Sequence, residues 1–195
     1  MQLVFATHNQ HKFQEVKAMV PTNIQLLSLK DLGLLDDIPE TGKTLAENAQ
    51  IKADFITQKF NIDCFADDTG LVIEVLDGEP GVYSARYAGT EKDDDANMQK
   101  VLAKLKDHLN RGAHFKTVFA LNLGKKKYLF EGIVHGEIIT EKRGNEGFGY
   151  DPIFKPSGYE KTFAELTLET KNKISHRAKA MQQLIDFLSN MGSQR

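Results

Sequence analysis

The sequence predicts an α/β fold built around a mixed β-sheet. In the first half of the chain, short apolar segments of strand length alternate with amphipathic helical patterns, which favours parallel strands joined by helices. In the middle, residues 114–123 and 127–139 are β-rich and are joined through Gly124 and Lys125, which indicates a long hairpin. Parallel and hairpin-paired strands together make the sheet mixed.

The first elements are a strand, a tight loop and a helix. Residues 2–6 are apolar enough for a short buried strand, and residues 24–28 suggest a second strand. Asn9 stands at the N-cap position of the helix between them. This helix carries its apolar residues on one face, at Phe13, Val16, Met19 and Val20.

A capping box begins the second helix, after an acidic, irregular stretch that contains Asp36, Asp37 and Glu40. Thr44 caps the first turn, and Glu47, three residues later, completes the box. The helix extends to about residue 59, and its buried stripe consists of Leu45, Ala49, Ala53 and Ile56.

The remaining elements follow from the same patterns. Residues 63–66 predict a strand that ends at Asp67 and Asp68, and the glycines and proline of residues 78–89 predict a structured loop. A third helix begins at residues 93–95, with one apolar face made of Met98, Val101, Leu102, Leu105 and Leu109. A last helix covers roughly residues 175–190 and faces inward with Ala178, Met181, Leu184, Ile185 and Leu188. No repeat or linker interrupts the chain, so residues 1–195 are expected to form a single domain.

The composition narrows the classes of function. The formal net charge of −2 gives no overall field for a long polyanion, so no nucleic-acid partner is expected and an anionic ligand needs a local cluster of Lys and Arg. One cysteine, Cys64, and six scattered histidines offer no zinc spacing. No apolar run approaches the roughly 18 residues of a membrane helix. Together with a chain start that lacks a signal-peptide pattern, this favours a cytoplasmic protein without a membrane partner.

A polar loop joins the first strand to the first helix and consists of Thr7, His8, Asn9, Gln10, His11 and Lys12. Backbone N–H groups and the positive end of the helix dipole point to one spot there, so a phosphate fits. In this interpretation Thr7 and Asn9 donate hydrogen bonds and Lys12 supplies charge. The alternative is that Asn9 only caps the helix and that Lys12 is a solvated lysine.

The pair Asp67 and Asp68 is a candidate metal site. Two carboxylates at the end of an apolar strand repel each other, and a cation between or beside them relieves that cost. Mg²⁺ is the natural candidate, because it binds few carboxylates together with water and phosphate oxygens. The alternative is an Asp-Asp turn in which Asp67 caps the backbone.

Three further groups of residues suit a phosphorylated nucleotide. Asn48 and Lys52 share one helix face, which either looks into a cleft or forms an exposed helix edge. In the loop of residues 147–152, two aromatic rings, Phe148 and Tyr150, either stack on a nucleobase or plug the loop. The start of the last predicted helix gathers positive charge and hydrogen-bond donors, at Lys171, Lys173, His176 and Arg177. Because a cationic N-terminus opposes the helix dipole, this cluster favours an anionic or acceptor-rich ligand.

Five segments in series resemble the inosine triphosphate pyrophosphatase family. They cover nearly the full length in the order expected of that family. The first is the pattern of Thr7, Asn9 and Lys12, and the others are ETGKTLAENAQIKA at residues 40–53, ADDTGLVIEVLDGEPGVYSARYAG at 66–89, GFGYDPIF at 147–154 and KNKISHRAKAM at 171–181.

The resemblance implies a two-lobed α/β fold, with a long mixed β-sheet flanked by helices and a central substrate cleft. It also implies a homodimer and hydrolysis between the α and β phosphates. The substrates it implies are non-canonical purine nucleoside triphosphates (ITP, dITP, XTP and dXTP), cleaved with Mg²⁺ to the monophosphate and pyrophosphate, which cleanses the nucleotide pool.

Carried over by position, the resemblance also implies roles for single residues. Glu40 and Asp68 are implied as magnesium ligands, and Asp68 also as the general base. Residues Thr7 to Lys12 and Lys52 are implied as phosphate contacts, and Thr69 as a further substrate contact. The implied sugar and base pocket consists of Phe148, Gly149, Tyr150, Asp151, Lys171, His176 and Arg177.

Two other functions stay open at this point. One is a pyrophosphatase for modified pyrimidine or methylated nucleotides, as in the related septum-inhibitor-like family. The other is a non-catalytic nucleotide- or RNA-binding module that uses the aromatic loop and the cationic cluster of residues 171–177.

Overall fold

The computed structural model describes residues 1–192. The fold of these residues is α/β, and their six strands pair in one sheet in the order β2-β1-β3-β4-β5-β6. Strand β1 is parallel to both β2 and β3, whereas β6 is antiparallel to β5. The predicted fold class and the mixed sheet are therefore confirmed.

The chain divides into two compact units. Unit 1 consists of Met1–Asp68, Thr117–Gly132 and Arg177–Arg195, and unit 2 consists of Thr69–Lys116 and Ile133–His176. The boundaries fall inside three strands, so each of them contributes residues to both units: β3 (Cys64–Ile73), β4 (Gly112–Leu123) and β5 (Lys126–Ile138).

Unit 1 begins with the predicted strand, loop and helix. These are β1 (Gln2–Phe5) and α1 (Gln10–Lys17), followed by β2 (Gln25–Ser28) and α2 (Leu45–Phe60). Helix α1 is shorter than predicted, so Met19 and Val20 lie after it and not on its apolar face, although both pack against the same core as Val16. The side chain of Asn9 accepts the N–H of Lys12 at 3.0 Å, which confirms the predicted N-cap. Both hydrogen bonds of the capping box between Thr44 and Glu47 are present at the start of α2. The last helix, α5 (His176–Gly192), supplies the remaining helix of this unit.

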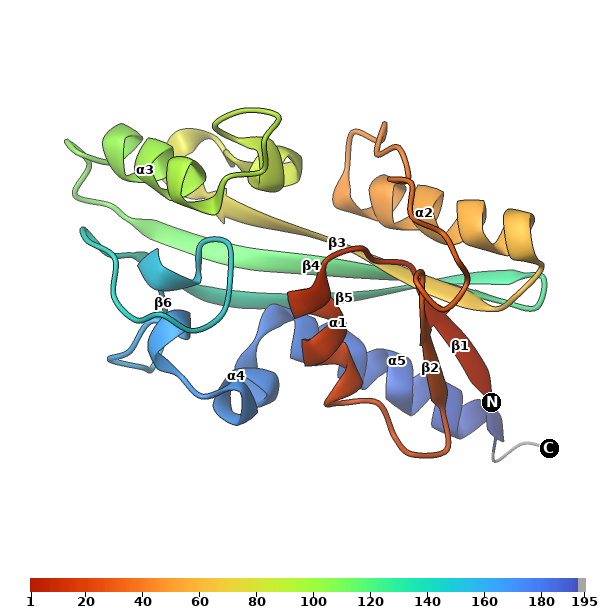
Figure 1. Cartoon of the computed structure of the whole chain (residues 1–195). Helices are drawn as coiled ribbons and strands as arrows, with labels where there is room; N and C mark the ends of the chain where they lie inside the picture. Colours follow the sequence, from red (N-terminus) through yellow and green to blue (C-terminus); the bar gives the residue numbers. More distant parts are fainter. Residues whose placement is uncertain (193–195) are drawn as a thin grey trace. The chain divides into compact units, whose positions relative to one another are not determined.

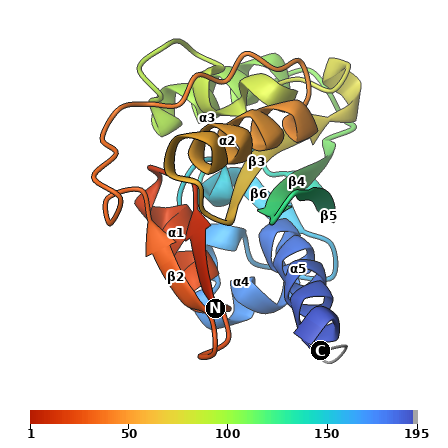
Figure 2. The same cartoon turned by 90° about the vertical axis from the view of Figure 1, so that its right-hand side faces the viewer.

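Alternation along the strands builds two apolar cores in unit 1. Successive strand side chains point to opposite faces of a sheet. Val4, Ala6, Cys64 and Ala66 therefore pack with Ala49, Ala53 and Ile56 of α2, and they form one core. The other core joins Leu3, Phe5, Phe65, Phe119 and Leu121 to Val16 of α1 and to Ala180, Met181, Leu184 and Leu188 of α5. Helix α2 thus covers one face of the sheet in unit 1, and α1 and α5 cover the other (Figures 1 and 2).

Unit 2 has one core of its own. The unit contains α3 (Asp94–Lys104), β6 (Phe154–Pro156) and α4 (Leu168–Ile174), together with parts of β3, β4 and β5. Aromatic rings dominate the centre of this core, where Phe115 meets Phe154 edge-on with 4.7 Å between ring centroids. Short 3-10 turns lie at Glu74–Leu76, Gly81–Arg86, Asp151–Ile153 and Phe163–Glu165, and the second of them falls within the structured loop predicted for residues 78–89.

Three further expectations about element boundaries are wrong. Strand β3 does not end at Asp67 and Asp68 but continues to Ile73, because both carboxylates find cationic partners and Leu71 and Ile73 extend the buried pattern. Helix α3 ends at Lys104, and the chain turns directly after it. Leu109 is consequently exposed and does not belong to the apolar face.

The third correction concerns the cationic cluster before the last helix. Lys171 and Lys173 belong to α4, a separate helix that Ser175 ends by adopting an extended conformation. Both lysines lie in the last turn of α4, where positive charge is favourable to the helix dipole. The electrostatic penalty inferred for these two residues from the sequence is therefore absent.

Candidate active site

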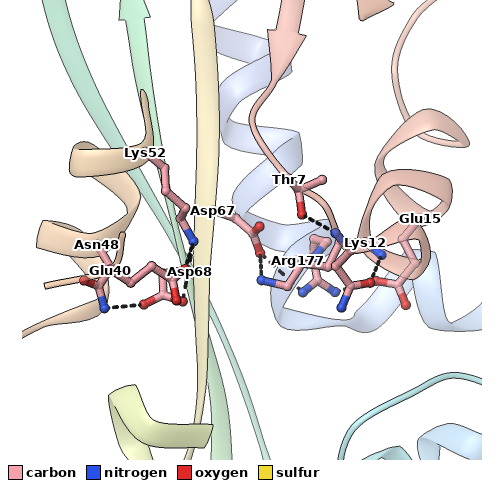
Figure 3. Close-up of polar contacts among 10 residues, drawn as sticks. Thr7, Lys12, Glu15, Glu40, Asn48, Lys52, Asp67, Asp68 and Arg177 are labelled. Atoms are coloured by element: carbon pink, nitrogen blue, oxygen red, sulfur yellow. Dashed lines mark hydrogen bonds and ion pairs between the residues drawn. The ribbon is translucent and has the colours of Figure 1, made fainter. Parts of the chain in front are cut away.

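Asp67 and Asp68 point to opposite faces of β3 (Figure 3). Asp67 pairs with Lys12 of α1 and with Arg177 of α5, whereas Asp68 faces Asn48 and Lys52 of α2. The alternation of a strand requires this separation. The hypothesis that the two carboxylates repel each other and share one cation is therefore wrong, as is the alternative of an Asp-Asp turn.

On the α2 face, two carboxylates gather around one lysine. The Nζ atom of Lys52 lies 2.5 Å from Oε1 of Glu40 and 3.8 Å from Oδ1 of Asp68. Asn48, one turn before Lys52, donates from Nδ2 to Oδ2 of Asp68 at 3.1 Å. Asn48 and Lys52 are both buried, so the alternative of an exposed helix edge is excluded, and their place in a substrate cleft stays a prediction.

The charges on this face shift the pKa values of both partners. Burial raises the pKa of Asp68, and the negative charge of Glu40 adds to the rise against the opposing effect of Lys52, Lys12 and the hydrogen bond from Asn48. Burial acts to lower the pKa of Lys52, but the carboxylates of Asp68, Glu40 and Asp67 outweigh it and raise that pKa. Lys52 is thus held charged, while Asp68 binds a proton more readily than an ordinary aspartate.

The donor set on this face fits Mg²⁺. Glu40 and Asp68 bring carboxylate oxygens to within 4.0 Å of the same ammonium group, so both already face one cation. Within residues 1–192, no group of three or more His, Cys, Asp or Glu side chains could hold a metal ion. Mg²⁺ does not require such a cage, because it completes its shell with water and substrate phosphate oxygens.

On the α1 and α5 face, three buried charges and the half-buried Lys12 form a network. Oδ2 of Asp67 lies 2.9 Å from Nζ of Lys12 and 3.4 Å from Nη2 of Arg177. The Nη1 atom of the same guanidinium donates to Oε2 of Glu15. Arg177 and Asp67 are each only 1% exposed. Two cations and two carboxylates balance here, so the network carries no formal net charge.

The ion pairs of this network decide the protonation of Asp67. Burial acts to raise the pKa of Asp67, but the nearby charges of Lys12, Arg177 and Lys52 hold it well below its usual range. Burial, together with the charges of Lys52 and Arg177, lowers the pKa of Lys12 despite the attraction of Asp67. Lys12 is therefore a half-buried lysine held in an ion pair, and the alternative of a solvated first-turn lysine is wrong.

The loop before α1 is used in part for its own structure. The hydroxyl oxygen of Thr7 accepts the N–H of Asn9 at 3.2 Å, while Asn9 caps α1. Nε2 of His8 lies 2.9 Å from the carbonyl oxygen of Asp36. Asn9, Gln10 and His11 are exposed on this loop. Asn9 thus has the capping role that the sequence left open, and the roles of these residues as phosphate contacts stay predictions.

Unit 2 collects the predicted pocket residues except Arg177. Lys171 and Asp151 form a buried ion pair at 2.5 Å, and Oδ2 of Asp151 also accepts the N–H of Phe148 at 3.0 Å. The ammonium of Lys171 lies 5.0 Å from the centroid of the Phe148 ring. His176 stacks on Phe115, with 4.7 Å between ring centroids. These contacts fix the shape of the aromatic loop.

The two aromatic rings of this loop differ in their surroundings. Tyr150 is buried in the core of unit 2, and its hydroxyl donates to the carbonyl oxygen of Ser84 at 2.7 Å. Phe148 is half-buried, and Gly149, also half-buried, donates its N–H to Asp94 at 2.7 Å. Tyr150 is therefore packed into the core of unit 2 whereas Phe148 is partly exposed, and the stacking of either ring on a base stays a prediction. Thr69, at the first position of unit 2, is half-buried.

Two residues of the charged network were missed as site residues in the sequence. Asp67 was considered only as a partner of Asp68, although the strict alternation of a strand already separates the two. Glu15 follows Lys12 by three residues and so lies on the same helix face, which was the available signal. Nothing in the sequence indicates that Arg177, 162 residues away, completes the network.

Known proteins similar to this chain agree with the fold. The sequence model of the Ham1 family matches residues 3–187. A protein of Flavobacterium psychrophilum named dITP/XTP pyrophosphatase is 56% identical over 190 residues, which is 97% of this chain and 100% of that protein. A protein of the same name from Flavobacterium johnsoniae is 57% identical over 189 residues, or 97% of this chain and 98% of that protein.

A solved structure extends the likeness to three dimensions. The Ham1 protein of Staphylococcus aureus superimposes with a TM-score of 0.89 at 40% sequence identity, and the match covers 98% of this chain and 100% of that one. A family match over nearly the whole chain, relatives above 50% identity and this superposition lead to one conclusion. The chain belongs to the Ham1 family.

Proposed function

We propose that this protein is a Mg²⁺-dependent nucleoside-triphosphate pyrophosphatase that hydrolyses ITP, dITP, XTP and dXTP to the monophosphate and pyrophosphate. The observation that carries the proposal is the cluster on the α2 face, where Asp68 is buried, held by Asn48 and placed beside Lys52 and Glu40. The name dITP/XTP pyrophosphatase of the two Flavobacterium relatives supports the substrate class.

Asp68 is the proposed general base. It accepts a proton from the water that attacks the α-phosphorus. Lys52 keeps the carboxylate in place from one side and offsets negative charge on the phosphates. Lys12, with residues Thr7 to His11, is proposed to hold the phosphate chain at the start of α1. Catalysis then rests mainly on position and electrostatics.

Glu40 and Asp68 are the residues that would hold Mg²⁺. When bound, the ion supplies positive charge to the phosphate oxygens and to the departing pyrophosphate. The protein's own contribution is the arrangement of the two carboxylates around Lys52, whose ammonium faces both of them.

Base selection is proposed to depend on the 6-oxo group of the purine. Donors from His176 and Arg177 can satisfy this acceptor, whereas adenine presents an amino donor and leaves them unpaired. A site built on such bonds discriminates by roughly 10⁴. The aromatic loop of unit 2, with Phe148, Gly149, Tyr150, Asp151 and Lys171, is proposed to form the pocket.

The family resemblance also supports a homodimer, and sedimentation equilibrium would measure it. Within residues 1–192, no helix is both long and apolar enough to cross a membrane. We place the protein in the cytoplasm, where the buried thiol of Cys64 stays reduced and where nucleotide pools are found.

The test is to incubate the protein with ITP, XTP, GTP and ATP and Mg²⁺, measuring pyrophosphate and orthophosphate. Pyrophosphate from ITP and XTP, with little from ATP and GTP, is expected. Orthophosphate as the first product would refute cleavage between the α and β phosphates. Preference for modified pyrimidine or methylated nucleotides would instead favour the septum-inhibitor-like activity.

Asp68→Asn tests the role of the proposed base. The substitution keeps the shape of the side chain but removes its basicity and its charge, so release of pyrophosphate is expected to fall below detection. Circular dichroism and thermal unfolding serve as the controls, and both should report a folded protein. Near-normal turnover by a folded Asp68→Asn variant would contradict the assignment.

A further inference from the structure

The side chain of Asn48 links the strand that carries Asp68 to the loop that carries Glu40 (Figure 3). Its Nδ2 donates to Oδ2 of Asp68 at 3.1 Å, and its Oδ1 accepts the backbone N–H of Gly42 at 2.8 Å. Asn48 is only 3% exposed, so water does not compete for either bond. Because the N–H of Gly42 can pair only with the amide oxygen, the NH₂ end of Asn48 must face Asp68.

We propose that Asn48 is a positioning residue, which fixes the Asp68 carboxylate relative to the Glu40 loop and thereby sets the rate of the chemical step. This inference rests on the proposed function of Asp68. By engaging Oδ2, Asn48 opposes rotation of the carboxylate and keeps Oδ1 on the side of Lys52. In this proposal Asn48 acts only through Asp68.

The approach of the Glu40 loop to α2 shows how closely this contact is built. A Cβ atom at Gly42 would lie 2.7 Å from Oδ1 of Asn48 and 3.0 Å from its backbone nitrogen. Such distances force a shift, so only glycine lets the loop come close enough for its N–H to hold the amide. Gly42→Ala therefore disturbs Asn48 without replacing it.

Another buried asparagine of unit 1 supplies a matched control. Asn122 donates from Nδ2 to Oδ1 of Asp54 at 2.9 Å and accepts from Nε2 of Gln50 at 2.9 Å. It is buried, and it bonds a carboxylate of α2 just as Asn48 bonds the carboxylate of Asp68. Asn122 and Asp54 have no proposed part in binding or catalysis. Comparing the same substitution at Asn48 and at Asn122 thus separates an effect on the orientation of Asp68 from an effect on the stability of the fold alone.

The experiment compares Asn48→Asp, Asn48→Ala, Gly42→Ala and Asn122→Asp with the wild type. Asn48→Asp keeps an acceptor for Gly42 but places a carboxylate against Asp68, and Asn122→Asp places one against Asp54. We expect both Asn48 variants to lose kcat for ITP by about 10–100-fold, as substitutions of residues that orient active groups do, with KM near the wild-type value. Gly42→Ala should also lower kcat for ITP. Asn122→Asp should lower the Tm while its folded fraction keeps the wild-type kcat.

A crystal structure of Asn48→Ala provides a readout that does not depend on turnover, and the Asp68 carboxylate is expected to rotate in it. The proposal is overturned if both Asn48 variants keep the kcat of Asn122→Asp, or if Asp68 keeps its conformation in the Asn48→Ala structure. If the wild type releases no pyrophosphate from ITP, the proposed function fails. The positioning of Asp68 by Asn48 is then decided by the crystal structure alone.

Discussion

At the scale of single residues, the charged network on the α1 and α5 face pairs two positive side chains with two negative ones. Asp67 accepts from Lys12 and Arg177, and Glu15 takes the other side of the Arg177 guanidinium. Removing one partner of such a set leaves a buried charge without compensation, which costs far more than the loss of an exposed pair. The network is therefore sensitive to any single change of charge.

Asp67→Asn tests this sensitivity. We expect the free energy of unfolding to fall by about 3–5 kcal/mol, because Arg177 stays buried, and Lys12 half-buried, with less opposing charge. Urea denaturation at neutral pH measures the change. Glu169→Gln is the comparison, since the pair of Glu169 and Lys173 is exposed and should contribute little. Equal, small losses in both variants would mean that the buried network adds no stability.

How far single residues could be predicted depends on the range of their contacts. The N-cap of Asn9 and the capping box of Thr44 and Glu47 are local, so the sequence showed both. The partners of Asp67 and Asp68 come from three helices that are distant in the chain. Only the fold brings them to β3, which is why the sequence paired the two aspartates with each other.

At the scale of elements, α2 positions the two side chains that face Asp68. Its capping box fixes where the helix begins, and the spacing of Asn48 and Lys52 then sets both toward Asp68. Two other elements, one strand and one helix, were not predicted because they are short. Strand β6 has three residues and α4 has seven, which is too short for a periodic pattern to stand out.

Thr44→Ala tests the start of α2. Loss of the cap is expected to destabilise the protein by about 1 kcal/mol, because the N–H of Glu47 loses its acceptor. Turnover of ITP by the folded variant should persist, since the tertiary contacts of α2 keep the helix in place. Thermal unfolding and steady-state assays measure the two quantities. Thr41→Ala, at an exposed threonine outside the box, should change neither, and an equal loss of stability there would contradict the role of the cap.

A pair of histidines on β4 and β5 predicts a dependence of stability on pH. The rings of His114 and His135 lie 5.4 Å apart in unit 2. Burial, the charge of His135 and that of Lys116 lower the pKa of His114 below 6.5, against the effect of Glu74. Between the lowered pKa and 6.5, the unfolded chain binds more protons at this site than the folded protein. Stability therefore falls as the pH drops below about 6.5.

His114→Gln should make the unfolding free energy depend less on pH between about 5 and 7, because the group that titrates is gone. Urea unfolding at a series of pH values gives this slope. His108→Gln, at an exposed histidine, should keep the slope of the wild type. An unchanged slope in His114→Gln would rule out His114 as its source.

At the scale of the whole molecule, the division into units explains why no boundary was visible in the sequence. A domain boundary usually falls in a linker rich in Pro, Gly or polar residues. Here the units meet inside β3, β4 and β5, where the pattern is that of ordinary strands. Each unit nevertheless has cores of its own.

The charge of the whole molecule predicts weak contact with polynucleotides. With 25 Lys and Arg against 27 Asp and Glu, and with several lysines and arginines paired, no general field attracts a long polyanion. Fluorescence anisotropy with labelled single-stranded RNA and DNA at about 0.15 M salt should show no binding at micromolar protein. Salt-dependent binding in that range would instead favour the RNA-binding module.

The pleat of β3 also constrains how this chain can change in length. Because Asp67 and Asp68 serve opposite faces, deleting one residue earlier in β3 would present each side chain to the wrong helix. Both the charged network and the proposed base would then be lost together, although every residue type were still present. A substitution along β3 changes one side chain on one face, whereas an insertion or deletion ahead of Asp67 changes both faces at once and is expected to be rejected by selection.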